Sequence, residues 1–186
     1  MNEPTKRNAI YADILALPEN LVGEIIRGQL HTHPRPAPKH AHAYSALGYS
    51  LGGPFSGGVG GPGGWWILDE PELHLGGDII VPDLAGWRRD RMPELPDTAW
   101  FDLAPDWACE ILSPSTARTD RALKMPINAR EGVPHLWLVD PDARTLEVYR
   151  LQDSGQWLLI GTLKEDDPVR QEPFAAVTFS LGSLWA

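Results

Sequence analysis

The chain has 186 residues, of which 42% are hydrophobic and 22% are charged, so it is long enough to bury one sizeable core. Its formal net charge of -9 argues against a protein that coats nucleic acid non-specifically, because such binding needs a basic surface. The same charge does not exclude a nuclease, in which local carboxylates hold a metal ion that supplies positive charge.

The composition also bears on the compartment. No apolar run approaches the roughly 20 residues that a membrane-spanning helix needs, and the N-terminus MNEPTKRNAI has no apolar signal segment. The single cysteine, Cys109, excludes an internal disulfide and fits a reducing compartment. We therefore expect a cytoplasmic protein that does not associate with membranes.

The N-terminal part of the chain predicts two helices and a hairpin. Residues 8–17 predict a short helix from the spacing of their apolar residues, and residues 21–33 predict two strands that turn at Arg27-Gly28. After a proline-rich loop, residues 40–51 predict a second helix. The glycine-rich tract 52–64 is expected to be a mobile loop outside the core. A phosphate-binding loop is the alternative, but the tract lacks the motif GxxxxGK[ST].

The rest of the chain predicts mainly strands. Residues 65–75 and 78–87 predict two strands joined through Gly76-Gly77, and a polar, proline-broken excursion follows. Further strands are predicted at 106–112, 135–141, 145–151, 156–163 and 175–181.

One connection in this part predicts the layout of the sheet. Residues 119–132 predict a helix between the strands 106–112 and 135–141, with a kink or an early stop at Pro126. A strand, a helix and a strand in that order form a right-handed crossover between parallel neighbours. We predict one domain over residues 1–186 of α/β or α+β class, with a mixed central sheet flanked by helices.

Three polar residues interrupt apolar segments: Asp83, Glu110 and Lys124. Alternation along a strand places Glu110 on the face opposite Cys109. If the strands that carry Asp83 and Glu110 are neighbours, the two carboxylates meet on one side of the sheet. Carboxylates that close repel each other unless a cation lies between them, and Mg²⁺ prefers such oxygen ligands together with waters.

Several segments resemble a known family. VPDLAGWRR, DWACEILSPST and TDRALKMPINAREGVPHLWLVDP are similar to the Uma-type putative restriction endonucleases, a branch of the PD-(D/E)XK nuclease superfamily. The resemblance runs from EIIRGQL to TLEVYRL, nearly the whole chain. It implies a restriction-endonuclease-like fold and the hydrolysis of DNA phosphodiester bonds with Mg²⁺, or Mn²⁺, as cofactor.

The resemblance also assigns roles to residues. It makes Asp83 and Glu110 metal ligands, with the backbone carbonyl of Ile111 as a third oxygen. The superfamily pattern has a lysine where this chain has Leu112; in this branch the lysine lies on the following helix, where Lys124 matches it.

Accessory positions follow from the same comparison of segments. Glu24 matches an acidic position that holds a water or a second metal, and His40 matches a histidine that contacts the substrate. Arg118 and Arg121 are candidates for contacts with phosphate groups. We predict a homodimer, because the chain has sheet edges and apolar residues such as Trp185. Nucleases that cut both strands of DNA also often form dimers.

Other interpretations of the same residues stay open. Asp83 can cap a turn, and Glu110 can be satisfied by an ion pair with Arg118, Arg121 or Lys124 without any catalysis. The chain is then a non-catalytic module that binds DNA or a protein partner; a hydrolase of another phosphate ester is a third possibility. The histidines are expected to be solvated loop residues rather than zinc ligands, because no cysteine accompanies His31, His33, His40 and His42.

Overall fold

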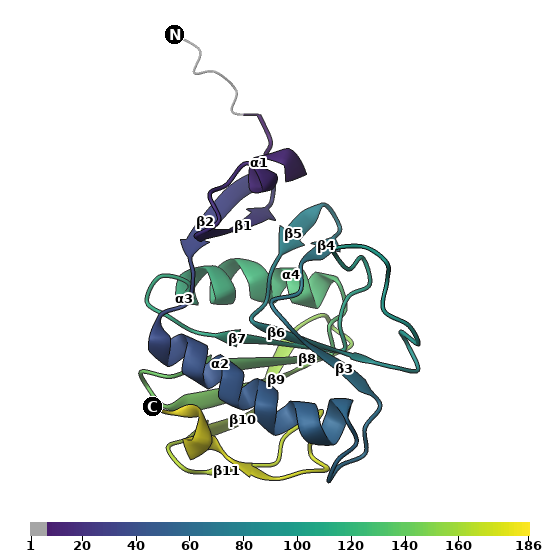
Figure 1. Ribbon diagram of the computed structural model, residues 1–186, viewed down its shortest axis with the longest axis vertical. Coiled ribbons are helices and arrows are strands. Elements are labelled where there is room, and N and C mark those ends of the chain that lie inside the picture. Colours follow the sequence, from purple (N-terminus) through teal and green to yellow (C-terminus); the bar gives the residue numbers. More distant parts are fainter. Residues whose placement is uncertain (1–6) are drawn as a thin grey trace.

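The fold is a six-stranded mixed sheet with helices on both faces and a smaller sheet at one end, seen in a computed structural model that describes residues 7–186 (Figure 1). In spatial order, the strands of the larger sheet are β10 (Trp157–Lys164), β9 (Thr145–Leu151), β8 (His135–Asp140), β7 (Trp107–Ile111), β6 (Leu84–Arg88) and β3 (Trp65–Asp69). Those of the smaller sheet are β2 (Gln29–Pro34), β1 (Leu21–Ile26), β5 (Asp78–Ile80) and β4 (Leu73–Leu75). The two-stranded sheet pairs β11 (Pro168–Val169) with β12 (Phe179–Ser180).

The crossover predicted from the sequence is confirmed. Strands β7 and β8 are parallel, and the other neighbours in the larger sheet are antiparallel. The connection between β7 and β8 is helical throughout residues 117–130, in the consecutive segments α3 (Ala117–Thr119), η2 (Asp120–Lys124) and α4 (Met125–Arg130). The mixed α+β class is therefore as expected.

Helices cover both faces of the larger sheet. The helix α2 (Pro38–Leu51) places Leu47 and Leu51 against Trp107 and Cys109 of β7, in the largest core cluster. On the opposite face, Ala108 packs with residues of the helical connection in a separate cluster. Figure 1 shows α2 crossing one face of the sheet and the helical connection lying between the two sheets. Glu110 points to the face that the helical connection covers, because it alternates with Cys109.

We expect Leu47→Ala to destabilise the protein by about 2–5 kcal/mol, because it removes buried methyl groups and leaves a cavity under α2. Leu47 is fully buried, whereas Tyr49 on the same helix is 88% exposed. The control Tyr49→Ala should change the free energy of unfolding by less than about 0.5 kcal/mol. Urea denaturation measures both, and equal effects would show that α2 does not anchor the core.

Two predicted strands are each divided, so the prediction for residues 65–87 is wrong in detail. The chain forms β3 and β6 in the larger sheet, with β4 and β5 between them in the smaller sheet. Pro71 and Pro82 stand at the two breaks. Because proline has no N–H to donate to a sheet, each break falls where the chain crosses from one sheet to the other. The hairpin between β4 and β5 does turn at Gly76-Gly77, as expected.

The glycine-rich tract is also different from the expectation. Its first residues form the helical turn η1 (Gly52–Ser56), and Phe55 is 2% exposed within the largest core cluster. One aromatic ring among glycines buries enough apolar surface to tie that end of the tract to the core. The strand predicted at 175–181 is limited to Phe179–Ser180 of β12.

The helix does not stop at Pro126. Proline cannot donate to the carbonyl four residues before it, and the wider turn η2 stands just ahead of it, so that the chain continues as α4. Of the two expected outcomes, a kink or an early stop, the early stop is therefore wrong, and the irregularity takes the form of this π-helical turn. Both Asp120 and Lys124 belong to it and are buried.

Two further expectations bear on partners and location. Within residues 7–186, no helix combines the length and the apolar character that crossing a membrane requires. The prediction that no signal segment is present falls partly on residues 1–6, which lie outside the described residues. Trp185 packs against the core and donates from Nε1 to the Glu165 carbonyl at 2.8 Å, so this side chain offers little to a second copy. The homodimer stays a prediction.

Candidate active site

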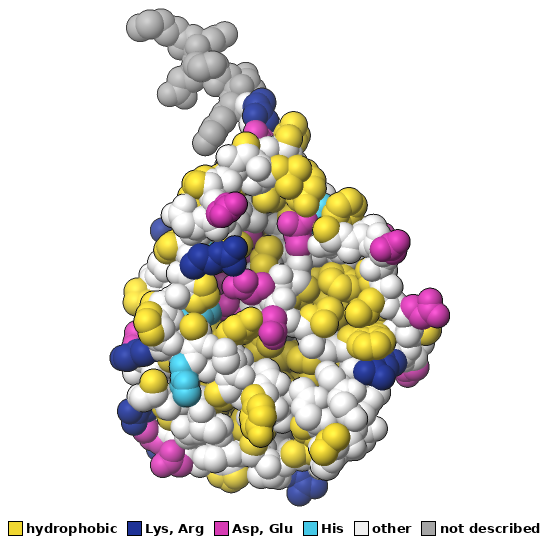
Figure 2. Space-filling view, in the orientation of Figure 1, with side chains coloured by type: hydrophobic (Ala, Val, Ile, Leu, Met, Phe, Trp, Pro, Cys, Tyr) yellow, Lys and Arg dark blue, Asp and Glu magenta, His cyan; other side chains and the backbone are white. Residues whose placement is uncertain are grey.

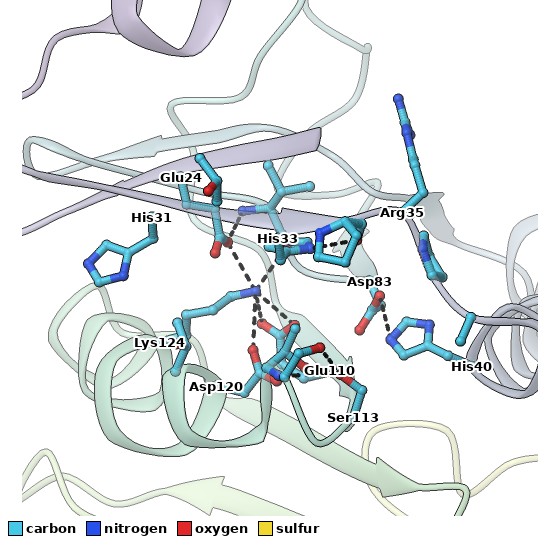
Figure 3. Close-up of a pocket in the computed structure, with 18 of the residues that line it drawn as sticks. Glu24, His31, His33, Arg35, His40, Asp83, Glu110, Ser113, Asp120 and Lys124 are labelled. Atoms are coloured by element: carbon cyan, nitrogen blue, oxygen red, sulfur yellow. Dashed lines mark hydrogen bonds and ion pairs between the residues drawn. The ribbon is translucent and has the colours of Figure 1, made fainter. Parts of the chain in front are cut away.

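A cavity of about 320 Å³ lies between the β1–β2 hairpin, the start of α2 and the turn that follows β7 (Figure 3). Its walls include all five side chains that the sequence singled out as catalytic or accessory: Glu24, His40, Asp83, Glu110 and Lys124. Figure 2 shows acidic side chains gathered on the face of the molecule between the hairpin and α2. Segments far apart in the chain therefore meet at one place.

Asp83 and Glu110 share a face because of the register of their strands. Strands β6 and β7 are antiparallel with Leu84 opposite Cys109, so one step further along puts Asp83 opposite Glu110. The Ile111 N–H donates to Asp83 Oδ2 at 2.6 Å, which fixes that carboxylate at the end of β7. The condition set by the sequence, that the two strands be neighbours, is met.

Lys124 lies among carboxylates. Its Nζ is 2.9 Å from each oxygen of Glu110, 3.1 Å from Glu24 Oε1 and 3.6 Å from Asp120 Oδ1. It also donates to the Val81 carbonyl at 2.9 Å. The four side chains are at most 5% exposed, so these charges are shielded from water. Figure 3 shows the lysine reaching from the helical connection toward all three acids.

The cavity holds more negative than positive charge, since four carboxylates line it together with Lys124 and Arg35. Burial raises the pKa of Glu110 well above its ordinary value; the charge of Lys124 opposes this shift, and the neighbouring acids add to it. Burial lowers the pKa of Lys124, but the charges of Glu110, Glu24 and Asp120 outweigh burial and raise it. The lysine is thus held charged, and Glu110 retains its proton more readily than a free carboxyl group does.

Asp120 was not identified from the sequence. Burial raises its pKa, and Lys124 opposes the shift. In the sequence it resembles an ordinary helical surface charge next to Arg121. The available signal was its position four residues before Lys124, the spacing at which helical side chains are neighbours.

His40 holds the other side of Asp83. Its Nε2 lies 3.3 Å from Asp83 Oδ1, and its ring is buried in the first turn of α2. Burial lowers the pKa of His40, but the hydrogen bond and the charge of Asp83 outweigh burial, so the pKa is raised. Asp83 is therefore positioned from two sides, by the Ile111 amide and by this imidazole.

The surroundings of Leu112 are consistent with the position of the lysine on the helical connection instead of on β7. This side chain is 5% exposed in the cluster beneath the helical connection, and its N–H pairs with the Val139 carbonyl of β8. A lysine at position 112 would enter an apolar core. Lys124 reaches Glu110 from the helix instead.

The two arginines expected at phosphate groups do not line the cavity. Arg121 pairs with Glu147 of β9 at 2.8 Å, and Arg118 is exposed. The arginine on the cavity wall is Arg35, which follows β2.

The expectation that the four histidines are loop residues is wrong, whereas the predicted strands within 21–33 and the predicted helix 40–51 do contain them. His31 and His33 belong to β2, and His40 and His42 belong to α2. Across residues 7–186, no three histidine, cysteine, aspartate or glutamate side chains are placed so that they could hold a metal ion by themselves.

Comparisons with known proteins agree with the fold. The sequence profile of the Uma2 family, described as putative restriction endonucleases, matches residues 11–182. The fold is similar to the crystal structure of a putative nuclease belonging to DUF820 from Anabaena variabilis ATCC 29413. The TM-score is 0.70 at 26% identity, over 93% of this chain and 95% of that one. No curated protein matches the chain. Because the Uma2 profile matches residues 11–182, the chain is a member of the Uma2 family of putative restriction endonucleases.

Proposed function

We propose that this protein is a Mg²⁺-dependent endonuclease that hydrolyses DNA phosphodiester bonds, with Asp83, Glu110 and Lys124 at its catalytic centre. The observation that carries the proposal is the pairing of two opposed carboxylates with an excess of buried negative charge around one lysine. Buried charges without partners are costly, so a divalent cation would relieve this cavity. Membership of a nuclease family supports the same conclusion.

The residues present fit such an ion. Glu110 Oε1 is buried and makes no hydrogen bond of good geometry, although it lies 2.9 Å from the lysine. Mg²⁺ is commonly held by one or two carboxylates and several waters, so a set of three acidic side chains is not required. Asp83, Glu110 and the Ile111 carbonyl would hold the ion, and Mn²⁺ accepts the same ligands.

The protein would contribute position and charge. When bound, the metal supplies a water of lowered pKa and stabilises charge on the phosphoryl group. His40 and the Ile111 amide keep Asp83 in place, and Lys124 offers N–H donors for a phosphoryl oxygen or the attacking water. Glu24 is tied to the Val81 N–H at 2.8 Å, which places it beside Lys124 as an accessory acid.

The ion pair between Lys124 and Glu110 also favours a second candidate. The ion pair compensates the charge of Glu110 in the absence of a metal ion. The protein could then be a non-catalytic module that binds DNA or a protein partner. In such a module the cluster would serve the fold alone. If the carboxylates only support the fold, Mg²⁺ should not stabilise the protein. If they form a metal site, the melting temperature should rise with the Mg²⁺ concentration.

A plasmid assay tests the proposed function. The purified protein should convert supercoiled DNA to nicked and linear forms with Mg²⁺ or Mn²⁺, and EDTA should stop the reaction. A parallel assay with a chromogenic phosphate ester separates a nuclease from a hydrolase of small esters. DNA that remains supercoiled with either metal would contradict the proposal.

A further inference from the structure

We propose that the cavity-facing side of β2 binds the phosphate groups of a nucleic acid strand beside the cleaved bond. We call His31, His33 and Arg35 the β2 strip. The inference rests on the proposed function and adds to it the surface that the substrate contacts.

Strand geometry aims the β2 strip at the cavity. His31 stands opposite Glu24 in the antiparallel register, and opposed residues share a face of the sheet. Glu24 faces the cavity, so His31 does too, and His33 follows by alternation. The Arg35 N–H continues the ladder to the Asn20 carbonyl at 3.4 Å, which keeps Arg35 in step with the two histidines. All three line the cavity, and Figure 3 shows them across it from Ser113 and Asp120.

The strip is open to a ligand. Strand β2 lies at the edge of the smaller sheet, and no strand of residues 7–186 pairs with its outer side. Figure 1 shows the hairpin projecting from the rest of the fold. The Arg35 side chain is 60% exposed, and its ion pair with Glu70 is long at 3.4 Å. Such an exposed pair contributes little, so the guanidinium is free to exchange Glu70 for a phosphate.

The charge of the cavity favours a basic strip at this position. The cavity floor repels a polyanion, since its carboxylates outnumber its one ammonium group. The permanent positive charge that lines the cavity above that floor comes from Arg35. Imidazole rings add N–H donors in either protonation state. Side-chain contacts of this kind, to phosphate rather than to bases, fix the position of a strand without reading its sequence.

Spacing and the opposite wall support the same occupant. Alternate residues on a strand lie roughly 6.6 Å apart, which is comparable with the separation of consecutive phosphates along a nucleic acid strand. Across the cavity stand the hydroxyls of Ser113, Ser115 and Thr116, joined by hydrogen bonds of 2.9 and 3.0 Å. Hydroxyl groups are common phosphate contacts. A strand lying between the two walls would meet donors on both sides.

Binding of a fluorescent DNA oligonucleotide tests the β2 strip. Ca²⁺ replaces Mg²⁺ in the assay, so that the DNA is held without being cut. Arg35→Ala should weaken binding about 5-fold or more and make the salt dependence shallower by about one phosphate contact. His31→Ala combined with His33→Ala should weaken it about 3-fold.

The matched control is Arg150→Ala, because Arg150 is also exposed and paired with a glutamate at 3.3 Å, yet does not line the cavity. It should bind as the unaltered protein does, and melting curves verify that every variant is folded. Equal affinity of Arg35→Ala and Arg150→Ala would overturn the β2 strip while leaving the cleavage assay, and so the proposed function, intact. An unaltered protein that binds no DNA would overturn the strip even if a metal-dependent activity on small esters were found.

Discussion

Replacing Lys124 with methionine should destabilise the metal-free protein by about 3–5 kcal/mol at pH 8, because the change removes the ammonium group that lies among three buried carboxylates. The lysine contacts Glu110, Glu24 and Asp120, and its side chain is 3% exposed. Methionine preserves most of the side-chain volume, so the loss reports the charge rather than a cavity. Urea denaturation at a fixed pH measures the difference.

The loss should depend on pH in a defined direction. Burial raises the pKa of Glu110 and Asp120, so their contribution to stability is present below the ordinary carboxyl pKa and is lost as the pH rises through the raised value. Without Lys124 the shift of Glu110 loses the charge that opposes it, and the shift of Asp120 is opposed by the hydrogen bond with Thr116 alone. The Lys124→Met defect should therefore be small near pH 5 and large at pH 8, and Mg²⁺ should reduce it at pH 8.

Arg121→Met is the matched control for this experiment. Arg121 lies on the same helical turn and pairs with Glu147 at 2.8 Å, but its side chain is 40% exposed. A partly exposed pair contributes about 1 kcal/mol or less. If Lys124→Met were as stable as Arg121→Met at pH 8, the buried cluster would not be charged as described.

Replacing Glu110 with glutamine should affect stability and activity in opposite directions. Removing a carboxylate whose pKa burial raises should leave the metal-free protein equally stable or up to about 1 kcal/mol more stable at pH 8. Lys124 keeps Glu24 at 3.1 Å and Asp120 at 3.6 Å, so it is not left without a partner. DNA cleavage should fall about 100-fold or more, since a metal ligand is lost.

The control for this variant is Glu147→Gln, an acid on β9 outside the cavity. It should cut DNA at the rate of the unaltered protein. A Glu110→Gln protein that cuts equally well would refute the role of Glu110 in catalysis. Loss of stability without loss of cleavage would assign the carboxylate to the fold alone.

The main lines of the fold and the site could be predicted because they depend on local patterns. The apolar runs of β7 and β8 and the helix between them predict a parallel pair, and the structure confirms it. Alternation along β7 separated Glu110 from Cys109, and the antiparallel neighbour β6 then brings Asp83 opposite Glu110. The parallel pair needs only the period of a strand and the order of elements, whereas the sequence left the pairing of β6 with β7 as a condition.

What could not be predicted depends on contacts between distant segments. Asp120 belongs to the site because Lys124 brings it together with Glu110 of β7 and Glu24 of β1. Its charge alone suggested a solvated helix face. Phe55 is buried because the far C-terminal segment supplies Phe174 as a partner, with ring centroids 4.7 Å apart. The strand that holds His31 and His33 was predicted, but their contact with the cavity depends on the packing of the hairpin over distant segments.

The central claim is that Asp83 and Glu110 converge on one divalent cation with Lys124 beside it. The most direct test is a crystal soaked in Mn²⁺, with the ion located by its anomalous scattering. The account predicts a peak bonded to both carboxylates and to the Ile111 carbonyl, and no such peak in Glu110→Gln crystals. A cavity without Mn²⁺ in the unaltered protein, or an ion bound away from these two acids, would contradict it.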